Sequence, residues 1–193
     1  MIVDLGAGDG LFVYHYARKN PDHFCIGIDS NRRPLEGISE KIHRKGSGGG
    51  APNVIYLQAA AEALPQELQE IANEVYVLFP WGSLLKGVAT GDIDLLTNIR
   101  RICAPSGSLH VLIALHAITD QSEIKRLGLP DELNADYIES VLRSRYSTAG
   151  FTIGDVSRHS LSELPDFQTT WARKLRTGSR RVLWLRANRK DCF

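Results

Sequence analysis

Residues 2–10 read IVDLGAGDG, an apolar run that ends in three glycines at alternating positions. Residues 2–5 are typical of a short buried strand, and an amphipathic helical pattern follows over 10–20. Glycines between a strand and a helix let the backbone approach a ligand closely. The stretch therefore predicts a strand, a ligand-binding turn and a helix, which together form the first unit of an α/β fold.

The alternation of apolar and amphipathic segments continues along the chain. The sequence predicts strands over 2–5, 24–28, 54–57, 74–79, 108–115, 151–156 and 181–185, and helices over 10–20, 31–45, 84–88, 92–102 and 135–149. Such alternation gives a mostly parallel sheet with right-handed crossovers and helices on both faces. We expect a single domain over 1–193, in which 116–133 and 157–170 are functional loops.

Composition places the chain among ordinary globular proteins. Of its 193 residues 43% are hydrophobic, and 23 basic against 22 acidic residues give a formal net charge of +1. No apolar run approaches the ~20 residues of a membrane helix, and residues 1–4 do not read as a signal peptide. The three cysteines and six histidines show no metal-ligand spacing. We expect a cytoplasmic protein without a metal or a membrane partner.

Positive charge is unevenly distributed. Over 171–193 eight basic residues stand against one acidic residue, Asp191, and a smaller basic cluster (Lys41, His43, Arg44 and Lys45) ends the second predicted helix. Clustered cations are the expected footprint of phosphate contacts, although charge runs are often only solvated surface. The neighbouring Trp171 favours a nucleic acid as the partner.

Two cofactor classes fit the glycine-rich turn: nicotinamide dinucleotides and S-adenosylmethionine. Asp29, about 20 residues after the turn, supplies the carboxylate that takes ribose hydroxyls, and residues 60–62 could line an adenine pocket. The spacing Gly-x-Gly-x-Gly differs from the pyrophosphate-binding Gly-x-Gly-x-x-Gly. Asp4 and Asp9 would repel a pyrophosphate and attract a methionine ammonium or sulfonium, although both could also serve turn and N-cap roles. The pattern favours S-adenosylmethionine.

Two of the three tryptophans stand where a planar substrate could stack. Trp81 follows the strand predicted over 74–79, Trp171 precedes the basic stretch, and Trp184 lies inside an apolar run typical of core. Enzymes that act on a nucleobase extrude it and hold it between aromatic faces. Phe79-Pro80-Trp81 lacks the polar first residue that holds an exocyclic amine, so a ring nitrogen, which needs no general base, suits this site better.

The chain resembles the aminoglycoside-resistance 16S rRNA (adenine-1408-N1)-methyltransferases, the kanamycin–apramycin resistance family. The resemblance covers nearly all of the chain and is carried by VDLGAGDG at 3–10, GID at 27–29, AAEALP at 60–65, FPWGSLL at 79–85 and TWARKL at 170–175. The first two motifs are generic to methyltransferases, and the last two are specific. The resemblance implies a seven-stranded class I methyltransferase fold with S-adenosylmethionine as donor.

The resemblance also implies the substrate and the residues that act on it. The substrate would be the assembled 30S subunit, with a flipped adenine between Trp81 and Trp171. A monomer is the simpler expectation for a protein that acts on a large ribosomal surface. The implied cofactor-binding residues are Asp4, Gly6, Gly8, Asp29, Ala61, Glu62, Ser83 and Thr169. The implied rRNA-binding residues are Lys41, Arg44, Lys45, Lys174, Arg180 and Arg181. The resemblance implies a β-hairpin before the first strand in family members, and we expect it to be absent here, because the given sequence begins at that strand.

Three other functions remain open from the residues themselves. The same turn could serve a methyltransferase for tRNA guanine-N7 or for a small planar molecule. The chain could also bind S-adenosylmethionine or RNA without turnover. A nicotinamide oxidoreductase is the last alternative.

Overall fold

The computed structural model describes residues 1–115, 119–165, 167–175 and 181–190. Its strands form one seven-stranded sheet in the order β3-β2-β1-β4-β5-β7-β6. The strands are β1 (Ile2–Leu5), β2 (Cys25–Asp29), β3 (Val54–Gln58), β4 (Ala72–Leu78), β5 (Cys103–Ile113), β6 (Phe151–Ser160) and β7 (Arg181–Arg189). All neighbouring pairs are parallel except those that include β7. The predicted mostly parallel α/β fold is confirmed.

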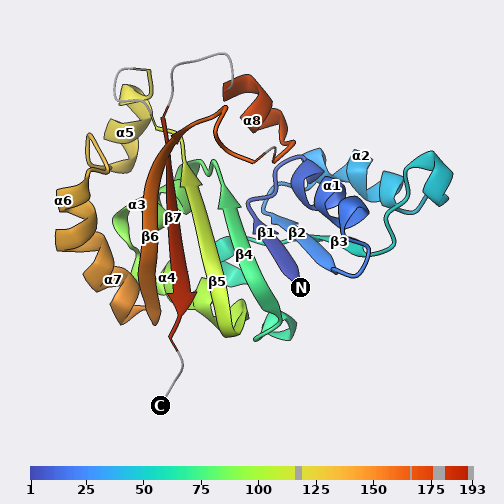
Figure 1. Ribbon diagram of the computed structural model, residues 1–193, viewed down its shortest axis with the longest axis horizontal. Helices are drawn as coiled ribbons and strands as arrows, with labels where there is room; N and C mark the ends of the chain where they lie inside the picture. The colour runs from blue at the N-terminus through green and yellow to red at the C-terminus, as the bar shows by residue number, and fades with distance from the viewer. Residues whose placement is uncertain (116–118, 166, 176–180, 191–193) are drawn as a thin grey trace.

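Helices cover both faces of the sheet (Figure 1). They are α1 (Leu11–Lys19), α2 (Arg32–Ile42), α3 (Gly82–Thr90), α4 (Ile93–Ile102), α5 (Gln121–Leu127), α6 (Ala135–Tyr137), α7 (Arg143–Thr148) and α8 (Thr170–Leu175). The buried side chains of α1 and α2 share one core with α8, and those of α3, α4, α5 and α7 share the other. Among the described residues, no helix combines the length and the apolar character that crossing a membrane requires.

The pleat of the central strands explains these two cores. Val3 and Leu5 face the core beneath α3 and α4, whereas Ile2 faces the core beneath α1 and α2. All four residues of β1 are buried, including Asp4. A parallel strand covered on both faces has a nearly continuous apolar sequence. A buried carboxyl group within such a strand is therefore unusual and suggests a functional role.

Three segments differ from the sequence-based expectation. The single helix expected over 135–149 is divided by a π-helical turn at Ile138–Leu142, which amphipathic spacing alone cannot distinguish from an α-helix. The segment 116–133, expected as a loop, contains α5, whose Ile124 and Leu127 are buried. The segment 157–170, also expected as a loop, begins as the end of β6 and finishes at α8, because pairing with β7 extends β6 to Ser160.

The glycine-rich turn has a left-handed backbone at each of its glycines. The Gly10 position (φ 68°) is also crowded, since a Cβ there would lie 2.5 Å from Cε1 of Tyr56. Tyr56 donates its hydroxyl hydrogen to the Gly10 carbonyl at 2.8 Å. The third glycine is therefore required both by backbone conformation and by the packing of β3 beneath the turn.

We expect Gly10→Ala to lower the free energy of unfolding by about 2–4 kcal/mol, from the left-handed strain and the overpacking against Tyr56. Gly37→Ala is the matched control, because a Cβ there meets nothing within 4 Å and the site lies inside α2. That control should stabilise the chain by about 0.5–1 kcal/mol. Urea denaturation of both variants measures the difference, and equal stabilities would contradict the packing argument.

Candidate cofactor and nucleobase site

A cavity of about 650 Å³ opens beyond the carboxyl ends of β1, β2 and β4. Ligands of open α/β sheets bind at this edge, and the volume is that of a small-molecule site. Every cofactor-binding residue predicted from the sequence lines this cavity: Asp4, Gly6, Gly8, Asp29, Ala61, Glu62, Ser83 and Thr169. Trp81 lines it as well. The structure thus brings these residues from five separate chain segments to one place.

Asp4 is the most perturbed group of the cavity. Its side chain is 1% exposed, and its Oδ1 has no hydrogen-bond partner among the described residues. Burial, followed by the nearby charges of Asp29 and Asp9, raises the pKa of Asp4 to about 8. A buried carboxyl group with an unpartnered oxygen, in a residue that lines a cavity, is suited to a cationic ligand group.

Asp29 holds the turn in shape. Its Oδ2 accepts the Gly8 N–H at 2.8 Å, and its Oδ1 accepts the Asn31 N–H at the same distance. One carboxylate therefore ties the turn after β1 to the start of α2. Each oxygen keeps a second lone pair, so Asp29 can still accept hydroxyl hydrogens from a ligand.

The segment that carries Ala61 and Glu62 forms a 3-10 turn (Ala61–Ala63) and is held from behind by α4. Asn98 donates to the Glu62 carbonyl at 2.9 Å, and Arg101 donates to the carbonyls of Leu64 and Pro65 at 2.6 and 3.1 Å. These two α4 side chains were not singled out from the sequence. Their roles depend on a packing contact that no local motif records.

Trp81 stands at the N-terminus of α3, is 39% exposed and contributes to the rim of the cavity. Phe79, two residues earlier, has a left-handed backbone (φ 51°), although its side chain is buried. Such a conformation is rare for a bulky residue, persists only where surrounding contacts impose it, and clusters at functional sites. The Phe79 N–H donates to the Leu112 carbonyl of β5 at 2.8 Å, which fixes the approach to Trp81.

Thr169 directly precedes α8, and its Oγ1 accepts the Ala172 N–H at 2.9 Å, which is N-cap geometry. Gln168 before it has φ 51°. Trp171 and Lys174 belong to α8, but their side chains lie outside the described part of the structure, as does Arg180. The backbone therefore brings Trp171 close to the cavity, because Thr169 and Thr170 line it.

Of the predicted basic residues, those whose side chains the structure describes lie near the end of α2 and at the start of β7. Lys41 lies in the last turn of α2, with its Nζ 4.4 Å from the centroid of the Tyr14 ring, and the exposed Arg44 and Lys45 follow this helix. Arg181 opens β7 and is exposed. These placements are compatible with a surface that contacts phosphates.

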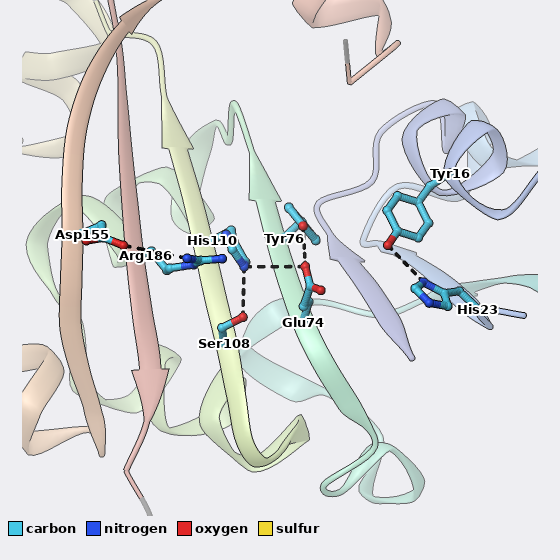
Figure 2. A network of polar contacts seen from close by, with 8 residues as sticks. All are labelled: Tyr16, His23, Glu74, Tyr76, Ser108, His110, Asp155 and Arg186. Carbon is cyan, nitrogen blue, oxygen red and sulfur yellow. Dashed lines mark hydrogen bonds and ion pairs between the residues drawn. The ribbon is translucent and has the colours of Figure 1, made fainter. Parts of the chain in front are cut away.

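A second group of polar side chains lies on the sheet away from the cavity (Figure 2). Buried His110 on β5 stacks on Tyr76 with ring centroids 4.6 Å apart and shares a hydrogen bond with Ser108 at 3.0 Å. Burial lowers the pKa of His110, so the ring is neutral near pH 7 despite Glu74 at 3.7 Å. None of these residues lines the cavity, so the network is a structural one.

The cavity residues fit S-adenosylmethionine better than a pyrophosphate cofactor. Three aspartates (Asp4, Asp9 and Asp29) surround the glycine-rich turn, and one of them presents an unpartnered buried oxygen. A pyrophosphate beside these carboxyl groups would be disfavoured, whereas an ammonium or sulfonium would favour the ionised form of Asp4. No group of three His, Cys, Asp or Glu side chains suited to a metal ion occurs in the described ranges.

Comparisons with known proteins agree with this reading. Residues 1–189 match the family model NpmA, 16S rRNA (adenine(1408)-N(1))-methyltransferase. The chain is 36% identical over 179 residues to the Escherichia coli protein of that description, covering 93% of this chain and 82% of the relative.

Two solved structures extend the similarity to the whole fold. The aminoglycoside resistance methyltransferase NpmB1 has 39% identity and a TM-score of 0.83, over 97% of this chain and 86% of its own. A mutant 16S rRNA (adenine(1408)-N(1))-methyltransferase from Catenulisporales acidiphilia, solved with its cosubstrate SAM, has 32% identity and a TM-score of 0.87, over 98% and 85%. The chain therefore belongs to the 16S rRNA (adenine(1408)-N(1))-methyltransferase family.

Proposed function

We propose that this protein transfers a methyl group from S-adenosylmethionine to N1 of adenine 1408 in 16S rRNA of the assembled 30S subunit. The observation that carries the proposal is the single cavity that joins the buried, unpartnered Asp4 carboxylate to the exposed Trp81. Asp4 suits a cationic group of a cofactor, and Trp81 presents an aromatic face to a planar base. Action on ribosomal subunits would occur in the cytoplasm and would confer aminoglycoside resistance.

The proposed reaction requires the protein mainly to position the cofactor and the base. When bound, S-adenosylmethionine supplies an electrophilic methyl group. Asp4 would hold its methionine end, Asp29 its ribose, and Ala61 and Glu62 its adenine side. N1 of adenine carries its own lone pair, so a base held here would need no proton removed before methylation. Alignment of this nitrogen is then the main catalytic contribution.

Trp81 has two roles in the proposal. It would stack on the extruded adenine together with Trp171, and stacking contributes ~1–3 kcal/mol per base. The methylated ring carries a positive charge, which an aromatic face stabilises by ~0.5–2 kcal/mol. An apolar strand end such as Leu78-Phe79-Pro80 suits a nitrogen acceptor that enters the reaction without a proton.

The rRNA-binding surface in this proposal spans α2, α1 and α8. His15 on α1 is half-buried, and burial lowers its pKa first, followed by the charges of Lys41, Lys19, Arg173 and Arg18. Cations from all three helices therefore gather around one point. Together with Arg44 and Lys45 they form a basic region beside the helix that carries Trp171.

We expect Arg44→Ala combined with Lys45→Ala to weaken 30S binding and to flatten its salt dependence. Loss of two phosphate contacts should lower the slope of log K against log salt by about 1.4–1.8. Arg32→Ala at the other end of α2, where Arg32 pairs with Glu36 at 3.1 Å, is the control and should leave the slope unchanged. Filter binding over a salt series provides the measurement, and an unchanged slope in the double variant would remove these residues from the RNA interface.

Primer extension on 16S rRNA tests the proposed reaction. Subunits incubated with the protein and S-adenosylmethionine should give a reverse-transcriptase stop beside adenine 1408, because an N1-methyl group blocks Watson–Crick pairing. The stop should require both the cofactor and assembled 30S subunits. If methylation instead occurs on free tRNA or on a small planar molecule, the proposed substrate is wrong while the methyltransferase assignment survives.

A further inference from the structure

The side chain of Asp9 joins two helices that are far apart in the sequence. Its Oδ1 accepts the Leu11 N–H at the start of α1, and its Oδ2 accepts the Thr170 N–H at the start of α8, both at 3.2 Å. The two partners are separated by most of the chain. Leu11 follows the glycine-rich turn, and Thr170 immediately precedes Trp171.

A carboxylate is the group that can make this bridge. The first N–H groups of a helix have no intrahelical partner, and the N-terminus of a helix favours negative charge. Asp9 has two oxygens that point in different directions, so it can accept one such N–H from each helix. An asparagine of the same shape has one oxygen, and its amide group would present a donor to the second N–H.

The bridge lies in a segment whose two ends are packed into the core. Phe167 packs against Phe12 of α1 with ring centroids 5.7 Å apart, and Ala172 is buried in the same core. Between them, Gln168 has a left-handed backbone and Thr169 caps the helix. The hydrogen bond from Thr170 to Asp9 joins this segment to the cavity wall, because Asp9, Thr169 and Thr170 all line the cavity.

We propose that Asp9 is a positioning residue that fixes the start of α8, and with it Trp171, to the cofactor-binding turn. Ligand binding and placement of the tryptophan helix are then coupled, since a cofactor in this cavity contacts both sides of the Asp9 bridge. The consequence for catalysis rests on the function proposed above. The structural coupling itself does not, and it can be measured without RNA.

Two substitutions remove the bridge from opposite sides. Asp9→Asn keeps one acceptor for the start of α1 but loses the second oxygen. Thr170→Pro removes the donor N–H and leaves a residue that is favourable at the first helical position. The matched control is Ile93→Pro, which places proline at the first position of α4, where Ile93 is 43% exposed and outside the cavity.

Amide hydrogen exchange of α8 is the first readout. Exchange at Trp171 and Ala172 should be faster in Asp9→Asn and Thr170→Pro than in the unmodified protein or in Ile93→Pro. S-adenosylhomocysteine should protect these amides in the unmodified protein and protect them less in the two bridge variants. Unchanged exchange in both bridge variants would overturn the proposal, whatever the substrate of the enzyme.

Single-turnover methylation of 30S subunits at saturating cofactor is the second readout. A hydrogen bond to a charged acceptor supports an expected decrease of about tenfold to a hundredfold for each bridge variant. The double variant should be no slower than the slower single variant, and cofactor affinity should change much less than the rate. Fully multiplicative effects would show that Asp9 and Thr170 act independently. Absence of methylation by the unmodified protein would count against the proposed function alone, because amide hydrogen exchange tests the Asp9 bridge independently of the reaction.

Discussion

Asp4→Asn is expected to weaken S-adenosylmethionine binding by about a hundredfold and to abolish its pH dependence. The carboxylate is buried beside the cavity with one unpartnered oxygen, and truncating one partner of a buried charge pair costs about 2–5 kcal/mol. In the free protein the pKa of Asp4 is raised to about 8, so a cationic ligand must bind the ionised form. Binding near pH 7 should therefore release close to one proton.

Calorimetry in buffers of different ionisation enthalpy measures that proton. Affinity for the unmodified protein should increase between pH 6 and pH 8 and then level off, whereas Asp4→Asn should give a flat profile. Asp22→Asn, on an exposed loop, serves as the control. Equal proton release by the unmodified protein and Asp4→Asn would show that Asp4 does not face the cationic end of the cofactor.

The same group sets a pH dependence of stability in the ligand-free protein. Its pKa is about 8 in the folded chain and near 3.9 in the unfolded chain, so the unfolded state loses its proton first. The contribution of Asp4 to the free energy of unfolding is therefore fully present below about pH 4. It decreases by up to about 1.4 kcal/mol per pH unit as the pH increases to 8. Asp4→Asn should lack this component, which melting temperatures at pH 5 to 8.5 can establish by difference.

Trp81→Ala is the second substitution with a large expected effect, a decrease of about 10- to 100-fold in the rate of methyl transfer to 30S subunits. Loss of base stacking costs ~1–3 kcal/mol, and stabilisation of the cationic product ring is lost with it. Affinity for S-adenosylhomocysteine should change little, because Asp4 and Asp29 are intact. The folded state should tolerate the change, since Trp81 is 39% exposed.

Trp81→Phe is the matched variant, because a smaller aromatic face should restore part of the rate that alanine loses. Single-turnover kinetics with saturating cofactor separates this effect from binding. A rate for Trp81→Ala equal to that of the unmodified enzyme would contradict the stacking role. Loss of S-adenosylhomocysteine binding in Trp81→Ala would instead assign this side chain to the cofactor part of the cavity.

Local pattern in the sequence was enough to predict the fold and most of the cavity wall. The fold class followed from the spacing of apolar residues, because buried strands that alternate with amphipathic helices form a layered, mostly parallel sheet. Asp4, Gly8 and Asp29 were recognisable because each lies within a strand end or in the turn that follows it, where the sheet edge gathers ligand-binding groups. Ser83 and Thr169 came from family resemblance and have no such local signal.

Contacts between distant segments could not be predicted from the sequence. Asn98 and Arg101 hold the Ala61–Ala63 turn through carbonyl groups, which any residue provides. The left-handed backbone at Phe79 and Gln168 occurs where no glycine signals it. The π-helical turn at Ile138–Leu142 has the same amphipathic spacing as an α-helix.

The sequence by itself determined the order of strands and helices, the glycine-rich turn and the residue types around the cofactor cavity, because these depend on hydrophobic periodicity and backbone conformation over short distances. Only the tertiary structure decided that Asp4 keeps an unpartnered buried oxygen and that Asp9 bridges the turn to α8. Those properties arise from desolvation and hydrogen bonding between segments up to 161 residues apart, which no local pattern encodes.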